Sequence, residues 1–103
     1  MTDIIPFLQG MLEREASDLH LKAGHPPVLR VHGQLVPQRD WPIFDTTALE
    51  AILEQLADET QRETFARELE LDFAYELGEE ARFRVNAACQ RGGVYLTLRA
   101  ISK

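Results

Sequence analysis

The chain has 103 residues, of which 45% are hydrophobic and 27% are charged, and its formal net charge at pH 7 is −6. This length suits a single small domain with one modest core, and the composition is typical of a soluble globular protein. The acidic balance argues against a general binder of nucleic acid or of anionic membranes, because such proteins need a basic face to displace counterions.

The chain begins with a predicted helix. Asp3 is a candidate N-cap for a helix that runs to about Glu15, and Pro6 fits because it lies in the first turn. The apolar residues of this segment recur at helical spacing and share one side: Ile4, Leu8, Met11 and Leu12.

A strand is predicted over residues 17–22, where the period of the apolar residues changes to two. Leu19 and Leu21 should point toward one face of this strand. Asp18 and His20 should point toward the other face. The two residues either have an intersubunit role, or Asp18 caps a turn or helix end and His20 is a satisfied surface or interface residue.

A hairpin is predicted next. The Gly-His-Pro-Pro segment at 24–27 ends the first strand, because proline cannot donate to a strand ladder. Two short extended runs, 28–32 and 34–36, flank Gly33 and indicate a hairpin or a bulged strand pair. Residues 37–44 are interpreted as a connecting loop.

Two further helices are predicted in the middle of the chain. The second helix starts near 45–47, where Thr47 and Glu50 have capping-box spacing. Its buried stripe comprises Leu49, Ile52, Leu53 and Leu56. A third, shorter helix follows Asp58, with Gln61 at the same capping distance.

The last third of the chain alternates in polarity and predicts an antiparallel meander. Its strands are expected at 72–77, 81–88 and 94–99, joined by turns at 78–80 and 90–93. The fold class is therefore α+β. An antiparallel sheet of about five strands with helices packed on one face is the simplest arrangement that buries every apolar stripe.

No catalytic residue and no metal site are predicted. The three histidines, Cys89 and Asp18 lack the spacing of known ligand sets, and one cysteine cannot form an internal disulfide. The sequence contains no Gly-x-x-x-x-Gly-Lys-Ser/Thr segment, so the chain alone is not expected to be an ATPase. It also lacks a cationic segment followed by a long apolar run, which favours the cytoplasm and no membrane span.

The strongest candidate for a binding function is a cationic strand face. Arg82, Arg84 and Asn86 alternate with apolar residues and share one face, and Arg99 could join them from the neighbouring strand. Guanidinium groups bind phosphate and carboxylate equally well. The alternative is a solvent-exposed ladder of ion pairs with Asp72, Glu76 or another acidic residue, and spacing alone favours that alternative.

Four segments together resemble the N-terminal domain of the type IV pilus retraction ATPases of the PilT/PilU type. They are Ala-Ser-Asp-Leu-His-Leu-Lys-Ala-Gly-x-Pro-Pro at 16–27, Arg-Val-x-Gly at 30–33, Leu-Asp-Phe at 71–73 and Ala-Arg-Phe-Arg-Val-Asn at 81–86. They occur in the family order and cover nearly the whole chain. The turn at 89–93 looks shorter than the glycine-rich turn usual in that family, which leaves a retraction motor, an accessory paralogue and a more distant relative as possible parents.

The resemblance implies a single PAS-like domain over residues 1–103, followed in a longer protein by a RecA-like domain that carries the P-loop. Such ATPases form cytoplasmic homohexamers at the pilus base, use ATP with Mg²⁺ and drive twitching motility. In the family this domain packs against RecA-like domains and lends arginines to the bound nucleotide. The residues implied here are Arg82, Arg84 and Arg99.

Other classes of function remain open. A free-standing PAS-like ligand sensor would need a cavity in the core and a bound small molecule. A purely structural adaptor would use the arginines only to pair with carboxylates. A further alternative is that the chain is the N-terminal domain of a related pilus-assembly or type II secretion ATPase.

Overall fold

The computed structural model describes residues 3–91 and 93–101, which form three helices and one six-stranded antiparallel sheet. The helices are α1 (Ile5–Glu13), α2 (Thr46–Leu56) and α3 (Glu59–Glu68). The strands are β1 (Ala16–Lys22), β2 (Val28–Val31), β3 (Gln34–Pro37), β4 (Glu70–Leu77), β5 (Ala81–Gln90) and β6 (Gly93–Ile101). The predicted α+β class is confirmed.

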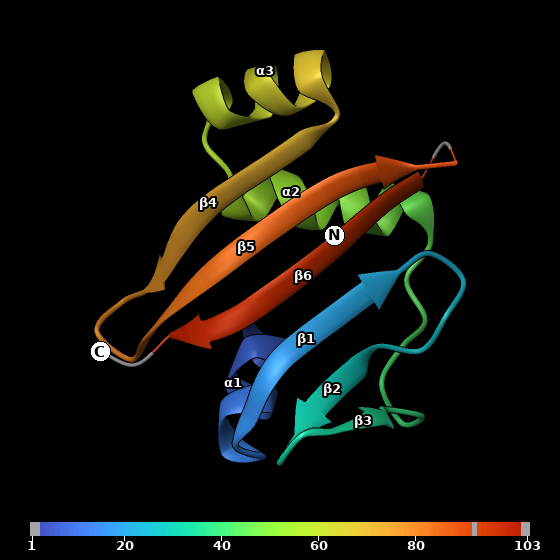
Figure 1. Ribbon diagram of the computed structural model, residues 1–103, viewed down its shortest axis with the longest axis vertical. Helices are drawn as coiled ribbons and strands as arrows, with labels where there is room; N and C mark the ends of the chain where they lie inside the picture. The colour runs from blue at the N-terminus through green and yellow to red at the C-terminus, as the bar shows by residue number, and fades with distance from the viewer. Residues whose placement is uncertain (1–2, 92, 102–103) are drawn as a thin grey trace.

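The sheet joins the two ends of the chain. Its strand order is β3-β2-β1-β6-β5-β4, so β1 pairs with β6 at the centre (Figure 1). The sequence predicted about five strands, and the sheet has six because both arms of the short hairpin pair as β2 and β3. His32 and Gly33 form the loop of this hairpin with φ angles of 49° and 82°, which match the twist of the flanking strands.

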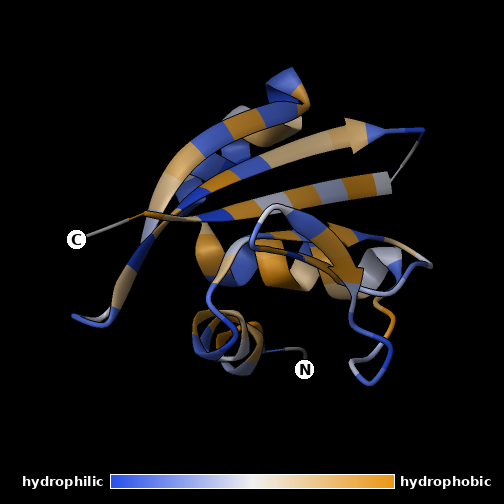
Figure 2. Cartoon of the chain, turned by 60° about the horizontal axis from the view of Figure 1, so that its bottom comes forward, coloured by the Kyte–Doolittle hydropathy of each residue, from blue (hydrophilic) through white to orange (hydrophobic). Residues whose placement is uncertain are grey.

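One face of the sheet carries the hydrophobic core. Helices α1 and α2 cover this face, and α3 lies beside β4 (Figures 1 and 2). Figure 2 shows hydrophobic and hydrophilic residues alternating along the strands. The largest fully buried strand side chains are Phe83, Leu19, Leu21, Leu29, Leu96, Leu98 and Val85. Burial of a side chain such as Phe83 contributes about 1.5–3 kcal/mol.

The opposite face of the sheet is polar, and α1 and α2 leave it uncovered (Figure 2). We call it the open face. Its side chains across β1, β2, β4, β5 and β6 include Asp18, His20, Lys22, Arg30, Asp72, Glu76, Arg82, Arg84, Asn86, Tyr95, Thr97 and Arg99.

Two predicted helix starts are wrong in detail. The N-cap of α1 is Ile4 and not Asp3, although the Asp3 carboxylate accepts a hydrogen bond from the Ile5 N–H at 3.0 Å. Helix α2 is capped by Asp45, whose carboxylate accepts from the Ala48 N–H at 2.8 Å. Thr47 lies inside the first turn of α2, so the predicted Thr47 cap does not form.

The predicted cap of α3 is confirmed. Asp58 accepts from the Gln61 N–H, and the Gln61 side chain accepts from the Asp58 N–H, which completes a capping box. At the other end of this helix, Leu69 is the C-cap in the left-handed conformation with φ 60°. In the predicted turn at 90–93, Gly92 lies outside the described residues, as do Ser102 and Lys103 at the end of the chain.

The segment predicted as a connecting loop packs firmly on α1. The Trp41 ring meets Phe7 edge-on with ring centroids 5.2 Å apart, and the Arg14 guanidinium lies 5.2 Å from the Trp41 ring centroid. Phe44 is buried against Phe7 from the same segment. The loop therefore closes one edge of the core.

Candidate functional site

The predicted arginines lie together on the open face. Arg82, Arg84 and Asn86 alternate with buried residues on β5, as the spacing predicts. The β5–β6 register places Arg99 directly opposite Arg84 and Thr97 directly opposite Asn86. Two guanidinium groups on facing positions repel each other unless an anion compensates for them. The structure supplies carboxylates on both sides of the Arg84 and Arg99 pair.

Carboxylates of β4 pair with the two arginines of β5. The Arg82 Nη2 and Nε atoms donate to Glu76 Oε1 at 2.6 and 3.1 Å. The Arg84 Nε and Nη2 atoms donate to Asp72 Oδ1 and Oδ2 at 3.2 and 3.4 Å, which is a two-pronged arrangement. All four side chains are at least half exposed, so each ion pair contributes only about 0–1 kcal/mol.

Asp18 occupies the centre of the open face and is buried beside two arginines and a histidine. Its carboxylate oxygens lie 3.8 Å from Arg99 Nε, 3.9 Å from Arg30 Nε and 3.9 Å from His20 Nε2. The Asp18 side chain is only 11% exposed, whereas that of Arg99 is 68% exposed. Asp18 therefore compensates for Arg99 as Asp72 compensates for Arg84.

The suggestion that Asp18 caps a turn or helix end is not supported. Asp18 lies within β1, and the C-cap of the preceding helix is Arg14. Both ring nitrogens of His20 are buried without a hydrogen-bond partner among the described residues, which does not fit a satisfied surface residue, and a position at an interface stays a prediction.

Arg30 is a member of this cluster that sequence reasoning missed. It pairs with Asp18 across β1 and β2 in the strand register. The Arg30 Nη1 atom also donates to the Gly33 carbonyl oxygen at 3.1 Å. The alternation of Arg30 with buried Leu29 could have predicted the face of the strand on which Arg30 lies. The strand order, which places Arg30 next to Asp18, could not be predicted from the sequence.

A shallow hollow lies between β4, β5 and β6 on the open face. Its volume is about 190 Å³, and it is lined by Asp72, Arg84, Asn86, Thr97 and Arg99. Pockets that enclose a small molecule usually measure about 300–1,000 Å³. The hollow thus has the donors for a phosphate group and lacks the volume for a whole nucleotide.

Within residues 3–91 and 93–101, no group of three or more His, Cys, Asp and Glu side chains is placed to hold a metal ion. None of the helices in the described part of the chain is long and apolar enough to cross a membrane.

Comparison with known proteins gives close relatives among pilus motors. The chain is 38% identical over 99 residues to the type IV pilus retraction ATPase PilT of Pseudomonas aeruginosa, covering 96% of the chain and 28% of that protein. It is 37% identical over 94 residues to the type IV pilus ATPase PilU of the same organism, covering 91% of the chain and 24% of PilU. No protein-family model matches the chain.

A solved structure of the pilus retraction motor PilT with bound ADP superposes with a TM-score of 0.90 and 28% identity, covering 99% of the chain and 30% of the motor chain. The fold and the sequence thus define the class of the chain, which is homologous to the N-terminal domain of PilT-like pilus ATPases. Within that class its homologues are the pilus retraction ATPases of the PilT/PilU type, and the chain spans less than a third of their length.

Proposed function

We propose that the chain works as the N-terminal domain of a hexameric type IV pilus retraction ATPase and that its open face lends arginines to a nucleotide held by a neighbouring RecA-like domain. The observation that carries the proposal is the 38% identity to PilT along almost the entire chain. The complete ATPase would act with ATP and Mg²⁺ in the cytoplasm at the pilus base. We also propose that the domain has a PAS-like fold.

The geometry of the open face supports the arginine role. Arg84 and Arg99 flank a hollow of about 190 Å³ with room for a phosphate group. A guanidinium brought to a γ-phosphate when domains close raises phosphoryl-transfer rates by several orders of magnitude. The hollow is too small to enclose the base and sugar of a nucleotide. The chain would therefore form one side of a site that it shares with the neighbouring RecA-like domain.

The arginines can be released from their present partners at low cost. The Arg82–Glu76 and Arg84–Asp72 pairs are exposed, and exposed pairs contribute about 0–1 kcal/mol. A phosphate carries more negative charge than a carboxylate, so exchange of one partner for the other is favourable when a nucleotide arrives.

The same ion pairs favour a second candidate, a structural adaptor within a pilus or secretion ATPase. In that function Arg82 and Arg84 would keep their carboxylate partners throughout and never contact a nucleotide. The domain would then act only through contacts with neighbouring domains.

The experiment that tests the proposal is an Arg84→Ala substitution in the full-length ATPase that contains this chain. The turnover number at saturating ATP should fall by about 10³-fold or more, while gel filtration still shows hexamers. Arg67→Ala is the control, because Arg67 is an exposed arginine on α3, away from the open face. Unchanged turnover in intact hexamers would remove Arg84 from the nucleotide site and leave the adaptor function.

A further inference from the structure

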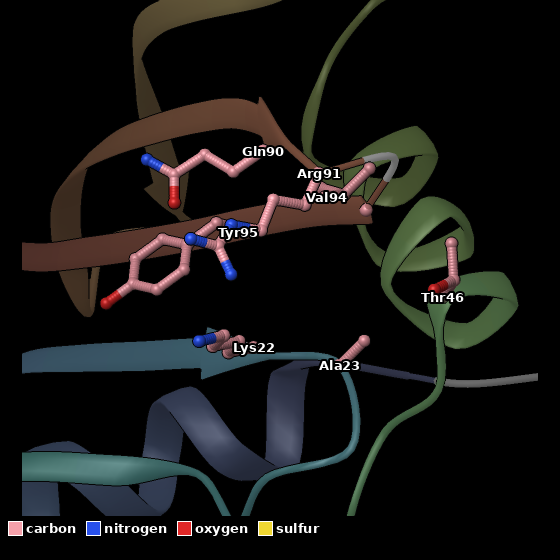
Figure 3. Close-up of a pocket in the computed structure, with 8 residues that line it drawn as sticks. Lys22, Ala23, Thr46, Gln90, Arg91, Val94 and Tyr95 are labelled. Atoms are coloured by element: carbon pink, nitrogen blue, oxygen red, sulfur yellow. The ribbon is translucent and has the colours of Figure 1, made fainter.

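A second hollow lies at the end of the sheet, where β1 ends and β5 turns into β6, next to the start of α2 (Figure 3). Its volume is about 250 Å³. It is lined by Lys22, Ala23, Thr46, Gln90, Arg91, Gly93, Val94 and Tyr95. Tyr95 precedes Arg99 by four positions along β6, which corresponds to about 13 Å. The hollow is therefore separate from the candidate nucleotide contacts.

Two cations line this hollow without an acidic partner. Lys22 lies opposite Tyr95 in the β1–β6 register, and Figure 3 shows the Arg91 side chain reaching back from the turn toward Tyr95. Neither Lys22 nor Arg91 forms an ion pair with any other residue in the part of the chain that the structure describes. The lining contains no carboxylate, although the chain as a whole is acidic.

The nearest acidic neighbour in sequence is already engaged. Asp45 precedes the lining residue Thr46, and its carboxylate accepts the Ala48 N–H as the cap of α2. An anion in the hollow would therefore meet two uncompensated positive charges, in contrast to Arg82 and Arg84, whose charges are paired.

The backbone at Arg91 adds an independent observation. Gln90 and Gly93 are paired across the β5–β6 hairpin, and Arg91, which follows Gln90 in the connection, has a φ angle of 51°. Asparagine, aspartate and glycine are the usual residues at such a position, because other side chains pay a steric cost of about 1–2 kcal/mol there. An arginine kept in a strained conformation beside a hollow points to a role for its side chain.

We propose that this hollow binds the phosphate monoester group of a small molecule with a flat apolar body. The guanidinium of Arg91 and the ammonium of Lys22 match the double negative charge of a phosphate monoester, and the guanidinium fork suits its oxygens. The Tyr95 ring offers a surface for a flat group next to the phosphate. The volume of about 250 Å³ is below the range of about 300–1,000 Å³ usual for pockets that hold drug-sized molecules, so the ligand must be small, and phenyl phosphate is the probe of that kind.

The test is a titration of the chain with phenyl phosphate, followed by backbone amide chemical shifts in NMR spectra. The amides of Lys22, Gly93 and Tyr95 should shift together and saturate. Arg91→Asn is the key variant, because asparagine suits the turn conformation and removes the cation, so the fold is retained. Its affinity should be weaker by about tenfold, and Lys22→Gln should act similarly.

Two comparisons define the ligand. Arg39→Gln, a change in an exposed arginine outside the lining, should leave the affinity unchanged. Inorganic phosphate that binds more weakly than phenyl phosphate supports a role for Tyr95, and equal binding restricts the proposal to the phosphate group. The proposal is overturned if phenyl phosphate gives no saturable shifts, if Arg91→Asn binds as well as the unaltered chain, or if benzoate binds more tightly than phenyl phosphate.

Discussion

Asp18 lies on the polar face of β1, where strand alternation predicts an exposed side chain, yet it is buried. The side chains of Arg30 on β2 and Arg99 on β6 lie on either side of the Asp18 carboxylate and shield it from solvent. Alternation along one strand predicts the face on which a residue lies. Its neighbours depend on strand order and register, which are properties of the whole sheet, and this is why the cluster around Asp18 could not be predicted.

Arg84 illustrates the same limit for the candidate site. The shared face of Arg82, Arg84 and Asn86 was predictable, because it depends only on a period of two within one strand. The position of Arg99 opposite Arg84 was not, because it depends on the length of the turn between β5 and β6.

Gly10 lies where α1 packs closely against the Trp41 ring. A Cβ atom at Gly10 would lie 2.9 Å from Trp41 Cζ2, which is closer than a van der Waals contact allows. Gly10→Val should therefore displace the Trp41 ring from α1 and lower the free energy of unfolding by roughly 1–3 kcal/mol. Urea unfolding measures the loss, and Gln9→Ala, an exposed change on the same helix, serves as the control. Equal stability of Gly10→Val and the control would contradict this packing.

Helix α3 differs from the other two helices because none of its residues is buried. Its apolar side is limited to partly buried contacts such as that of Phe65. Local interactions such as the Asp58 capping box must therefore contribute a large share of the stability of α3. Because a capping box depends only on residues close together in the chain, the sequence could predict it. At α2 the competing Asp45 cap was missed, because both Asp45 and Thr47 are good capping residues and only the backbone decides between them.

Loss of the Asp58 capping box should destabilise the first turn of α3. Asp58→Ala removes the acceptor of the Gln61 N–H and should cost about 1 kcal/mol. Amide hydrogen exchange should accelerate in the first turn of α3 and stay unchanged in α2. Glu63→Ala, an exposed change in the middle of α3, is the matched control. Unaltered exchange in Asp58→Ala would show that packing alone holds the helix.

The free energy of unfolding should depend on pH through Asp3, which precedes α1 and bonds to Gln55 of α2. The Gln55 side chain amide donates to Asp3 Oδ1 at 2.7 Å, and this bond, aided by the Ile5 N–H, lowers the pKa of Asp3 below its ordinary value of 3.8. A lowered pKa in the folded state means that the stabilisation is complete above the ordinary value and is lost as the pH falls through the folded-state value.

Asp3→Asn tests this effect. The stability gap between the unaltered chain and the variant should be constant above about pH 5 and should shrink below the ordinary value of 3.8. Urea unfolding midpoints over this range measure it. Asp40→Asn is the control, since Asp40 is exposed and makes no hydrogen bond with another described residue. A gap that stays constant down to about pH 2 would contradict the Asp3 assignment.

At the scale of the whole molecule, the sheet brings together residues from both ends of the sequence. Strands β1 and β6 pair at its centre, so the open face combines Asp18 with Arg99 and Arg84 (Figure 1). One side of the sheet packs against α1 and α2 to form the core, and these two helices leave the other side uncovered. The α+β class was predictable from periodicity, whereas the relation to pilus ATPases came from four short motifs in order and is supported by 38% identity to PilT.

The central claim is that Arg84 acts on a nucleotide and does not merely pair with Asp72. The most direct measurement is the ATPase turnover of the full-length protein with the double substitution Asp72→Arg and Arg84→Asp, which exchanges the two charges and can preserve their ion pair. Arg84→Ala and Asp72→Ala are measured beside it, and gel filtration verifies that hexamers persist. If Arg84 acts on the nucleotide, the exchanged protein should be as inactive as Arg84→Ala. Turnover restored by the exchange would show that the ion pair is all that Arg84 provides and would contradict the account.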